Sequence, residues 1–207
     1  IYIKCPSSAI NTGCLIEVSY LGTDGEPCVG NEGYARNTAR YDDRDNVIEV
    51  ATYGTDGSLC LNNVGAAILT KHYDERGNLI EGDYYGTDGK PCLNHENCAK
   101  WTKRYDGKGK CLEVAFYGLD GELCMSSYGY ARTTYEFNDR GKEIEMDCYD
   151  VSGQRCVSIY GYSIRNTHYN EKGFAAEIYY LGADSLPIEP RGYYREVRTL
   201  NERGEVE

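Results

Sequence analysis

The sequence predicts an all-β protein, built as an elongated solenoid or twisted sheet of stacked 32-residue β-hairpin repeats. A motif of the form Tyr-Gly-x-Asp-Gly returns at a constant spacing of 32 residues. Apolar and polar residues alternate with a period of two between its copies, as in a half-buried strand, and no window shows the apolar stripe of a helix. A lone hairpin is only marginally stable in water, whereas stacked copies bury a continuous apolar face. The copies should therefore stack, or curl into a shell if their twist accumulates.

Four columns of residues define the repeat. The motif begins at Leu21, Tyr53, Tyr85, Tyr117, Tyr149 and Leu181. Cysteine recurs at Cys28, Cys60, Cys92, Cys124 and Cys156, and glutamate at Glu17, Glu49, Glu81, Glu113, Glu145 and Glu177. A turn glycine recurs at Gly13, Gly77, Gly109, Gly141, Gly173 and Gly204, with Asp45 in its place once. We therefore expect residues 1–207 to form a single tandem-repeat array with repeats at about 1–32, 33–64, 65–96, 97–128, 129–160 and 161–191, and a half repeat at 192–207.

Each repeat is predicted to be a hairpin followed by a loop. The segment 34–41 serves as a first strand, and 73–78 as a turn in which Asp and Asn bond the backbone and Gly accepts a positive φ. In the second strand, Ile48 and Val50 face one way and Glu49 and Ala51 the other. Both ends of the sequence look like interior repeats, so we expect further repeats or another copy, stacked head to tail, to continue them.

Charge and composition narrow the possible partners. The 207 residues carry a net charge of −11, which argues against binding to nucleic acid or anionic membranes. No apolar run approaches the roughly 18 residues of a membrane-spanning helix, so we expect no membrane insertion. The ten cysteines, an even number, favour an oxidising compartment and thus an extracellular or cell-surface location.

The cysteines leave two possibilities open. Cys5 and Cys14, like Cys98 and Cys111, flank a predicted turn, so each pair is a disulfide candidate. Alternatively, the five column cysteines are small buried thiols that fill one layer of the stack and need no oxidation.

The remaining polar residues favour structural roles. An enzyme needs one site, whereas the glutamates occur once per repeat and can pair across strands with Arg36, Lys100, Arg132 and Arg195. His72 and His168 share a column that otherwise holds polar residues, which indicates an exposed position and no ligand set. The Asp-Gly pairs are typical of tight turns and lack the close oxygen ligands of a calcium loop. We therefore expect no catalytic residue, no metal and no cofactor.

Aromatic residues are the candidates for ligand binding. Regular ladders of tyrosine can stack on sugars, although tyrosine is also a good strand residue. The candidates are Tyr53, Tyr85, Tyr117 and Tyr149, together with the single tryptophan, Trp101.

The segments Tyr73–Asn78 and Tyr85–Pro91 resemble bacterial tyrosine-aspartate hairpin repeats, of which the Rhs/YD-repeat proteins are the best-known relatives. The resemblance implies spiralling sheets of β-hairpins in a large surface or secreted protein. A fainter resemblance links the chain to carbohydrate-binding repeats of bacterial cell-wall proteins and toxins. The sequence thus favours a structural repeat protein that stacks and polymerises with itself, and the alternative is a multivalent glycan or cell-wall binding module.

Overall fold

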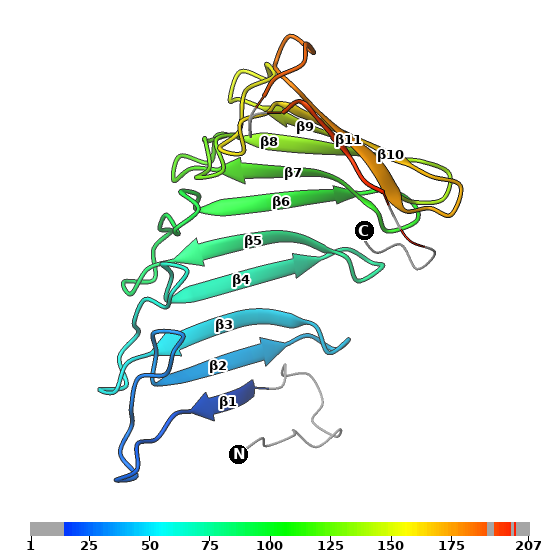
Figure 1. Ribbon diagram of the computed structural model, residues 1–207. Coiled ribbons are helices and arrows are strands. Elements are labelled where there is room, and N and C mark those ends of the chain that lie inside the picture. Colours follow the sequence, from blue (N-terminus) through cyan, green and yellow to red (C-terminus); the bar gives the residue numbers. More distant parts are fainter. Residues whose placement is uncertain (1–14, 190–192, 200, 202–207) are drawn as a thin grey trace. The chain divides into compact units, whose positions relative to one another are not determined.

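The computed structural model describes residues 15–189, 193–199 and 201, and the regular elements in this part of the chain are all β-strands (Figure 1). They form one open antiparallel sheet in which each strand pairs with its neighbours in sequence, from β1 to β12. The expected all-β sheet of hairpin repeats is thereby confirmed. The strands are β1 (Leu15–Ser19), β2 (Arg36–Tyr41), β3 (Val47–Tyr53), β4 (Ile68–Tyr73), β5 (Leu79–Tyr85), β6 (Lys100–Tyr105), β7 (Cys111–Tyr117), β8 (Arg132–Phe137), β9 (Glu143–Tyr149), β10 (Ile164–Tyr169), β11 (Ala175–Leu181) and β12 (Arg195–Val197).

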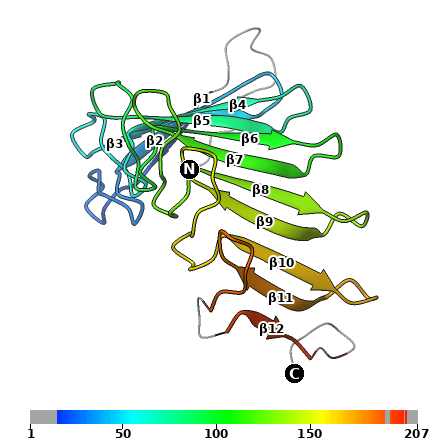
Figure 2. The ribbon, with the colours of Figure 1, turned by 90° about the horizontal axis from the view of Figure 1, so that it is seen from above.

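The chain divides into two compact units. The first contains Ile1–Thr102 and Gly118–Glu122, and the second contains Lys103–Tyr117 and Leu123–Glu207. In the second unit, β8 to β12 lie side by side in chain order (Figure 2). The described part of the chain contains no helix that is long and apolar enough to cross a membrane.

The hairpin turns form as predicted. The Asp74 carboxylate accepts the backbone N–H groups of Arg76 and Asn78 at 2.9 and 2.8 Å. Gly77 completes the turn with a φ of 85°, a conformation that glycine adopts without steric cost. In the preceding hairpin Asp45 adopts a φ of 63° at the equivalent position, which aspartate tolerates better than most residues. The turn at Gly13 and the one at Gly204 lie outside the described residues.

The segment between two hairpins is a loop, as predicted, and it is built of two tight turns, of which the Asp-Gly pair predicts the first. Asp56 caps the first by accepting the N–H of Ser58, and an isolated bridge joins Tyr53 to Leu59. In the second, the Asn62 side chain accepts the N–H of Val64 at 2.9 Å. The N–H of residue 62 donates to the carbonyl of residue 66, which closes that turn.

These loops are linked from one repeat to the next through the backbone. The N–H of Asn63 donates to the Glu32 carbonyl at 3.1 Å, and the N–H of His95 donates to the Val64 carbonyl at 2.8 Å. In the second unit the N–H of Ile159 makes the same bond to Tyr128, at 2.9 Å. Each loop therefore stacks on its predecessor while the strands beside it pair edge to edge.

The buried core lies where each hairpin joins its loop. The column of small residues at 35, 67, 99, 131 and 163 is at most 5% exposed, whereas most residues in the middle of the strands are half-buried. Larger side chains such as Tyr84 and Phe116 pack around these joints. The alternation of apolar and polar residues in the second strand therefore predicts which residues share a face of the sheet. It does not predict how deeply each residue along the strand is buried.

One cross-strand pair of residues packs differently from the equivalent pair in the preceding repeat. Gly82 of β5 pairs with Trp101 of β6, and a Cβ atom built on Gly82 would lie 2.6 Å from the Trp101 ring. One repeat earlier, Val50 and Leu69 occupy the same two positions. The missing side chain at position 82 thus makes room for the indole.

We expect Gly82→Val to destabilise the fold by about 1–3 kcal/mol because its side chain overlaps the indole. Trp101→Leu should cost a similar amount because it leaves a cavity. The double variant recreates the Val50–Leu69 pair, so it should be more stable than the sum of the single effects predicts. Urea denaturation followed by circular dichroism measures all three. Strictly additive losses would show that the two positions do not pack as described.

Candidate functional site

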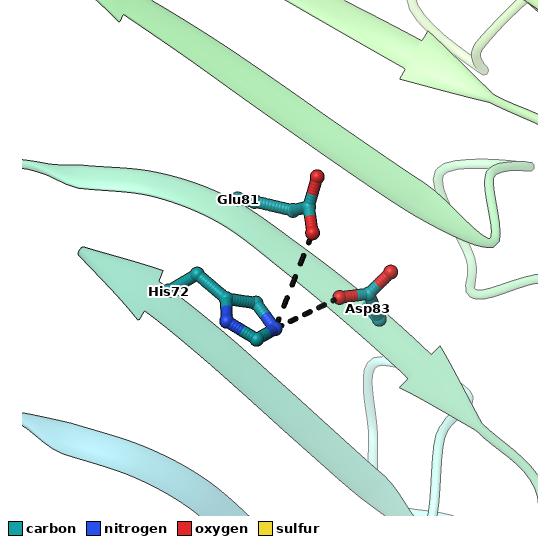
Figure 3. Close-up of side chains that lie close together, drawn as sticks. All are labelled: His72, Glu81 and Asp83. Atoms are coloured by element: carbon teal, nitrogen blue, oxygen red, sulfur yellow. Dashed lines mark ion pairs between the residues drawn. The ribbon is translucent and has the colours of Figure 1, made fainter. Parts of the chain in front are cut away.

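A cluster of three potential ligand residues lies on the hairpin of β4 and β5. His72 stands directly opposite Glu81 in the antiparallel register, and Thr70 stands opposite Asp83. Residues two apart on a strand share a face, so the register brings the imidazole and both carboxylates to one surface. Figure 3 shows the three side chains pointing toward one another from the two strands.

The three groups converge through specific atoms. The His72 Nε2 atom lies 3.7 Å from Asp83 Oδ2 and 4.0 Å from Glu81 Oε1 (Figure 3). One nitrogen and two oxygens, one from each residue, all lie within 4.8 Å of one another. The Asp83 and Glu81 side chains are 22% and 32% exposed, so the cluster is open enough for a small ion to reach it.

The two negative charges of the cluster are accompanied by one positively charged lysine. Burial, and after it the negative charge of Glu81, raises the pKa of Asp83. The Thr70 hydroxyl donates to Asp83 Oδ2 at 3.3 Å. Lys100 of β6 approaches Glu81 through its other oxygen, Oε2, at 3.5 Å and leaves Oε1 facing the imidazole. Two carboxylates are thus held together with one ammonium group beside them.

The equivalent positions of other repeats carry different groups. In the β2–β3 hairpin Arg40 pairs with Glu49 at 3.3 Å, and the position of Asp83 is taken by Ala51. His168 and Glu177 approach to 3.9 Å in the β10–β11 hairpin, but the third position is Tyr179, whose hydroxyl donates to Glu177.

The β8–β9 hairpin has carboxylates at all three positions. Glu136 faces Glu145 directly across the strands, and Asp147 stands two residues further along β9. Arg155 pairs with Asp147 at 2.8 Å. Burial, and then the charge of Asp147, raises the pKa of Glu145. Among the described hairpins, the combination of one imidazole and two carboxylates therefore occurs at His72, Glu81 and Asp83.

The predicted cross-strand charge pairs are confirmed. In four of the six copies, the column glutamate pairs with a basic residue 18 or 19 positions later, on the next strand of the sheet. The pairs are Glu17 with Arg36 at 2.8 Å, Glu81 with Lys100 at 3.5 Å, Glu113 with Arg132 at 3.0 Å and Glu177 with Arg195 at 2.6 Å.

The sequence did not predict the three-residue cluster. The histidine column by itself predicts an exposed position without a ligand set, and the side chain of His72 is indeed 58% exposed. The cluster, however, combines three columns that meet only through the register of β4 and β5. The Asp83 carboxylate was the available signal, because Ala51 and Ala115 occupy its place in the flanking repeats.

The described cysteines are free thiols. The disulfide candidates Cys98 and Cys111 are among them, and the other candidate pair, Cys5 and Cys14, lies outside the described residues. Cys98 is fully buried and contacts Asn94 Oδ1 at 3.4 Å, while Cys111 points to the carbonyl of Glu113, also at 3.4 Å.

The column cysteines connect neighbouring loops. All five are free thiols and half-buried. Cys60 Sγ lies 3.9 Å from the Gly33 carbonyl of the preceding loop, and Cys156 makes the equivalent contact with Gly129 at 3.5 Å. Burial raises the pKa of the Cys60 and Cys156 thiols, which keeps them in the unreactive protonated form.

The aromatic candidates are engaged within the sheet. The guanidinium of Arg36 lies 3.9 Å from the ring centre of Tyr53, and that of Arg132 lies 4.4 Å from the ring centre of Tyr149. Tyr85 and Tyr117 end their strands at the same position and are also half-buried. Trp101 packs over Gly82 and donates to the Tyr84 hydroxyl at 3.2 Å.

Two solved structures are similar to this chain over most of its length. One is the crystal structure of TcdB2-TccC3-Cdc42, with a TM-score of 0.45, 15% sequence identity and coverage of 91% of this chain. The other is the Photorhabdus luminescens Tc holotoxin pore with a mutated TccC3, with a TM-score of 0.43, 15% identity and coverage of 91%. The chain spans 10% of the length of each of those chains. No protein-family model matches the chain, and neither does any curated protein.

We expect Glu136→Arg to stabilise the protein at neutral pH by about 0.2–1 kcal/mol, because it replaces opposed like charges with an ion pair. A carboxyl whose pKa is raised in the folded state binds its proton more readily there than in the unfolded chain. Acidification through that pKa therefore stabilises the parent protein, and the advantage of the variant should shrink.

Urea denaturation at pH 7 and at pH 5 measures this difference. Glu171→Arg is the matched control, since it makes the same change in net charge at the tip of the next turn, where Arg140 bonds the backbone carbonyl, which the substitution keeps. An equal gain from both variants would assign the effect to net charge alone.

Proposed function

We propose that this chain is a structural repeat protein whose hairpins build a scaffold by stacking. The observation that carries the proposal is that strand pairing, turn capping and loop-to-loop bonds recur with the same geometry in successive repeats. Arg44 reaches the Glu75 carbonyl of the next turn at 2.7 Å, and Arg140 reaches that of Glu171 at 2.9 Å. Neighbouring repeats are thus joined at the turns, along the strands and at the loops. Such a design favours length and stiffness, and we assign it no catalytic role.

We further propose that the scaffold extends by pairing with itself at the sheet edge. β12 pairs with β11, and in the sheet order it stands at one end. Val197 and Tyr194 on and beside this strand are 62% and 42% exposed. An outer strand offers unpaired backbone groups to another strand, and burial of these apolar side chains would add to the contact. Further repeats of the same polypeptide or a second copy, head to tail, would supply that strand and lengthen the array into a fibre.

Display outside the cell fits such an array, and we retain an extracellular or surface location as part of the proposal. The number of cysteines favours that location, whereas the free thiols of the described part of the chain give it no support. Glycan binding through the tyrosine columns likewise stays a prediction. The stacking of Arg36 on Tyr53 and of Arg132 on Tyr149 already covers one face of each ring.

Deletion of residues 65–96 tests the scaffold directly, because it removes one whole repeat and joins positions that are equivalent in the array. We expect the shortened protein to fold with the same circular dichroism spectrum and a modestly lower stability, since the deletion removes one repeat and one repeat interface. Deletion of residues 65–80, half a repeat, is the control and should prevent folding. If both deletions abolish folding equally, the repeats are not independent building units.

Self-association through the edge is tested by sedimentation over a range of concentrations. We expect the parent protein to form larger species as its concentration rises and Val197→Lys to suppress them, because a charge at an outer strand opposes strand addition. Val151→Lys, at an apolar position of similar exposure in a turn, should leave association unchanged. A parent protein that stays monomeric at every concentration would contradict assembly through this edge.

A further inference from the structure

We propose that His72, Glu81 and Asp83 bind a divalent transition-metal ion at one rung of the array. The ligand atoms are His72 Nε2, Glu81 Oε1 and Asp83 Oδ2, which approach one another from adjacent strands (Figure 3). One imidazole with two carboxylates is a donor set that suits first-row divalent ions. The three side chains leave the other coordination positions of the metal to water.

The geometry needs a modest adjustment to close around an ion. Adjacent ligands about 2.1 Å from a metal lie about 3.0 Å apart in octahedral geometry and about 3.4 Å apart in tetrahedral geometry. The nitrogen–oxygen distances of 3.7 and 4.0 Å exceed these separations by about 1 Å or less, and all three ligand atoms lie within 4.8 Å of one another. Side-chain rotation covers such a difference, while the paired strands hold the Cα atoms in place.

The strands around the cluster supply charges that a cation would balance. Glu81 and Asp83 bring two negative charges to one surface, and Lys100 pairs with the Glu81 oxygen that faces away from His72. His72 also borders a groove of about 390 Å³ between two turns, where Asp42, Asp43 and Asp74 contribute further carboxylates. These groups attract a cation toward the imidazole, although Arg44 and Lys71 in the same groove offset part of their charge.

Comparison between repeats identifies Asp83 as the residue that distinguishes the β4–β5 hairpin from the β10–β11 hairpin. The β10–β11 hairpin keeps the histidine and the glutamate, at 3.9 Å, but holds Tyr179 where Asp83 stands. There Arg195 and Tyr179 both bond Glu177, which lowers the pKa of that carboxyl and leaves no excess negative charge. The His168 hairpin is therefore an internal control in which two of the three ligands are present and already engaged.

Manganese(II) is the appropriate probe, because this hard ion favours carboxylates over cysteine sulfur, and the ten cysteines of the chain would compete for zinc or copper. The chain contains three histidines, so their imidazole signals in a carbon–proton correlation spectrum can be assigned by substitution. We expect substoichiometric Mn²⁺ to broaden the His72 signal while His168 and His95 stay sharp. Electron paramagnetic resonance of free Mn²⁺ then gives the affinity.

Two substitutions separate metal binding from a structural ion pair. Asp83→Asn, which keeps the shape of the side chain, should weaken Mn²⁺ binding by at least about 10-fold, the scale of effect that even an outer-sphere partner has. Lys100→Gln should tighten binding, because it frees the second oxygen of Glu81, whereas loss of an ordinary ion pair would only destabilise the fold. His168→Ala should leave the affinity unchanged.

Equal broadening of His72 and His168, with the same titration for Asp83→Asn as for the parent protein, would overturn the site. Weakening by Lys100→Gln would also count against it, since the ammonium would then help to hold the cluster together. A selective, saturable site on the parent chain that survives in His168→Ala and is lost in Asp83→Asn supports the proposal. Because scaffold assembly is measured without metal, either proposal can fail while the other stands.

Discussion

The array depends on a pair of backbone hydrogen bonds at a residue with a small side chain. The N–H of Ala67 donates to the Tyr85 carbonyl of its own hairpin at 2.8 Å, and its carbonyl accepts the N–H of Thr52 from the preceding hairpin at 2.9 Å. Ala131 makes the same two bonds, to Tyr149 and Phe116. Because the backbones approach here at full burial, a large side chain would separate them. This joint fixes the register of a hairpin with its own return strand and with the previous repeat.

That register explains which features the sequence could predict. The turn residues Asp74 and Gly77 act locally, so the conformation follows from their chemistry alone. The pairing of Glu113 with Arg132 follows from a constant repeat length, because the same offset of 19 residues also joins Glu17 to Arg36. Periodicity therefore suffices to predict a contact between two columns of residues that are separated by a fixed number of positions.

Features that depend on three or more columns could not be predicted in the same way. The cluster at His72 needs the register within one hairpin and the replacement of an alanine by Asp83. The second turn of the loop was not predicted, because capping by Asn62 depends on a hydrogen bond to position 66, which the motif Tyr-Gly-x-Asp-Gly does not include. The position of the buried core at the joints was not predicted either. The alternation of side chains along a strand indicates which face of the sheet each residue lies on, but it does not indicate how deeply the residue is buried.

A regular backbone also explains how one rung can differ from the rest. The bonds at the joints and loops involve main-chain atoms, which are the same whatever side chains the strands carry. Gly82, which pairs with Trp101 of the next hairpin, and Asp83, which lies beside His72, therefore alter the two faces of β5 without changing its pairing. The charge balance is equally local: the Tyr179 hydroxyl and Arg195 lower the pKa of Glu177, whereas Glu145 has its pKa raised beside Asp147. In a stack held by its main chain, each hairpin can thus carry its own surface chemistry, and the scaffold provides the fixed strand spacing on which a site such as His72–Glu81–Asp83 depends.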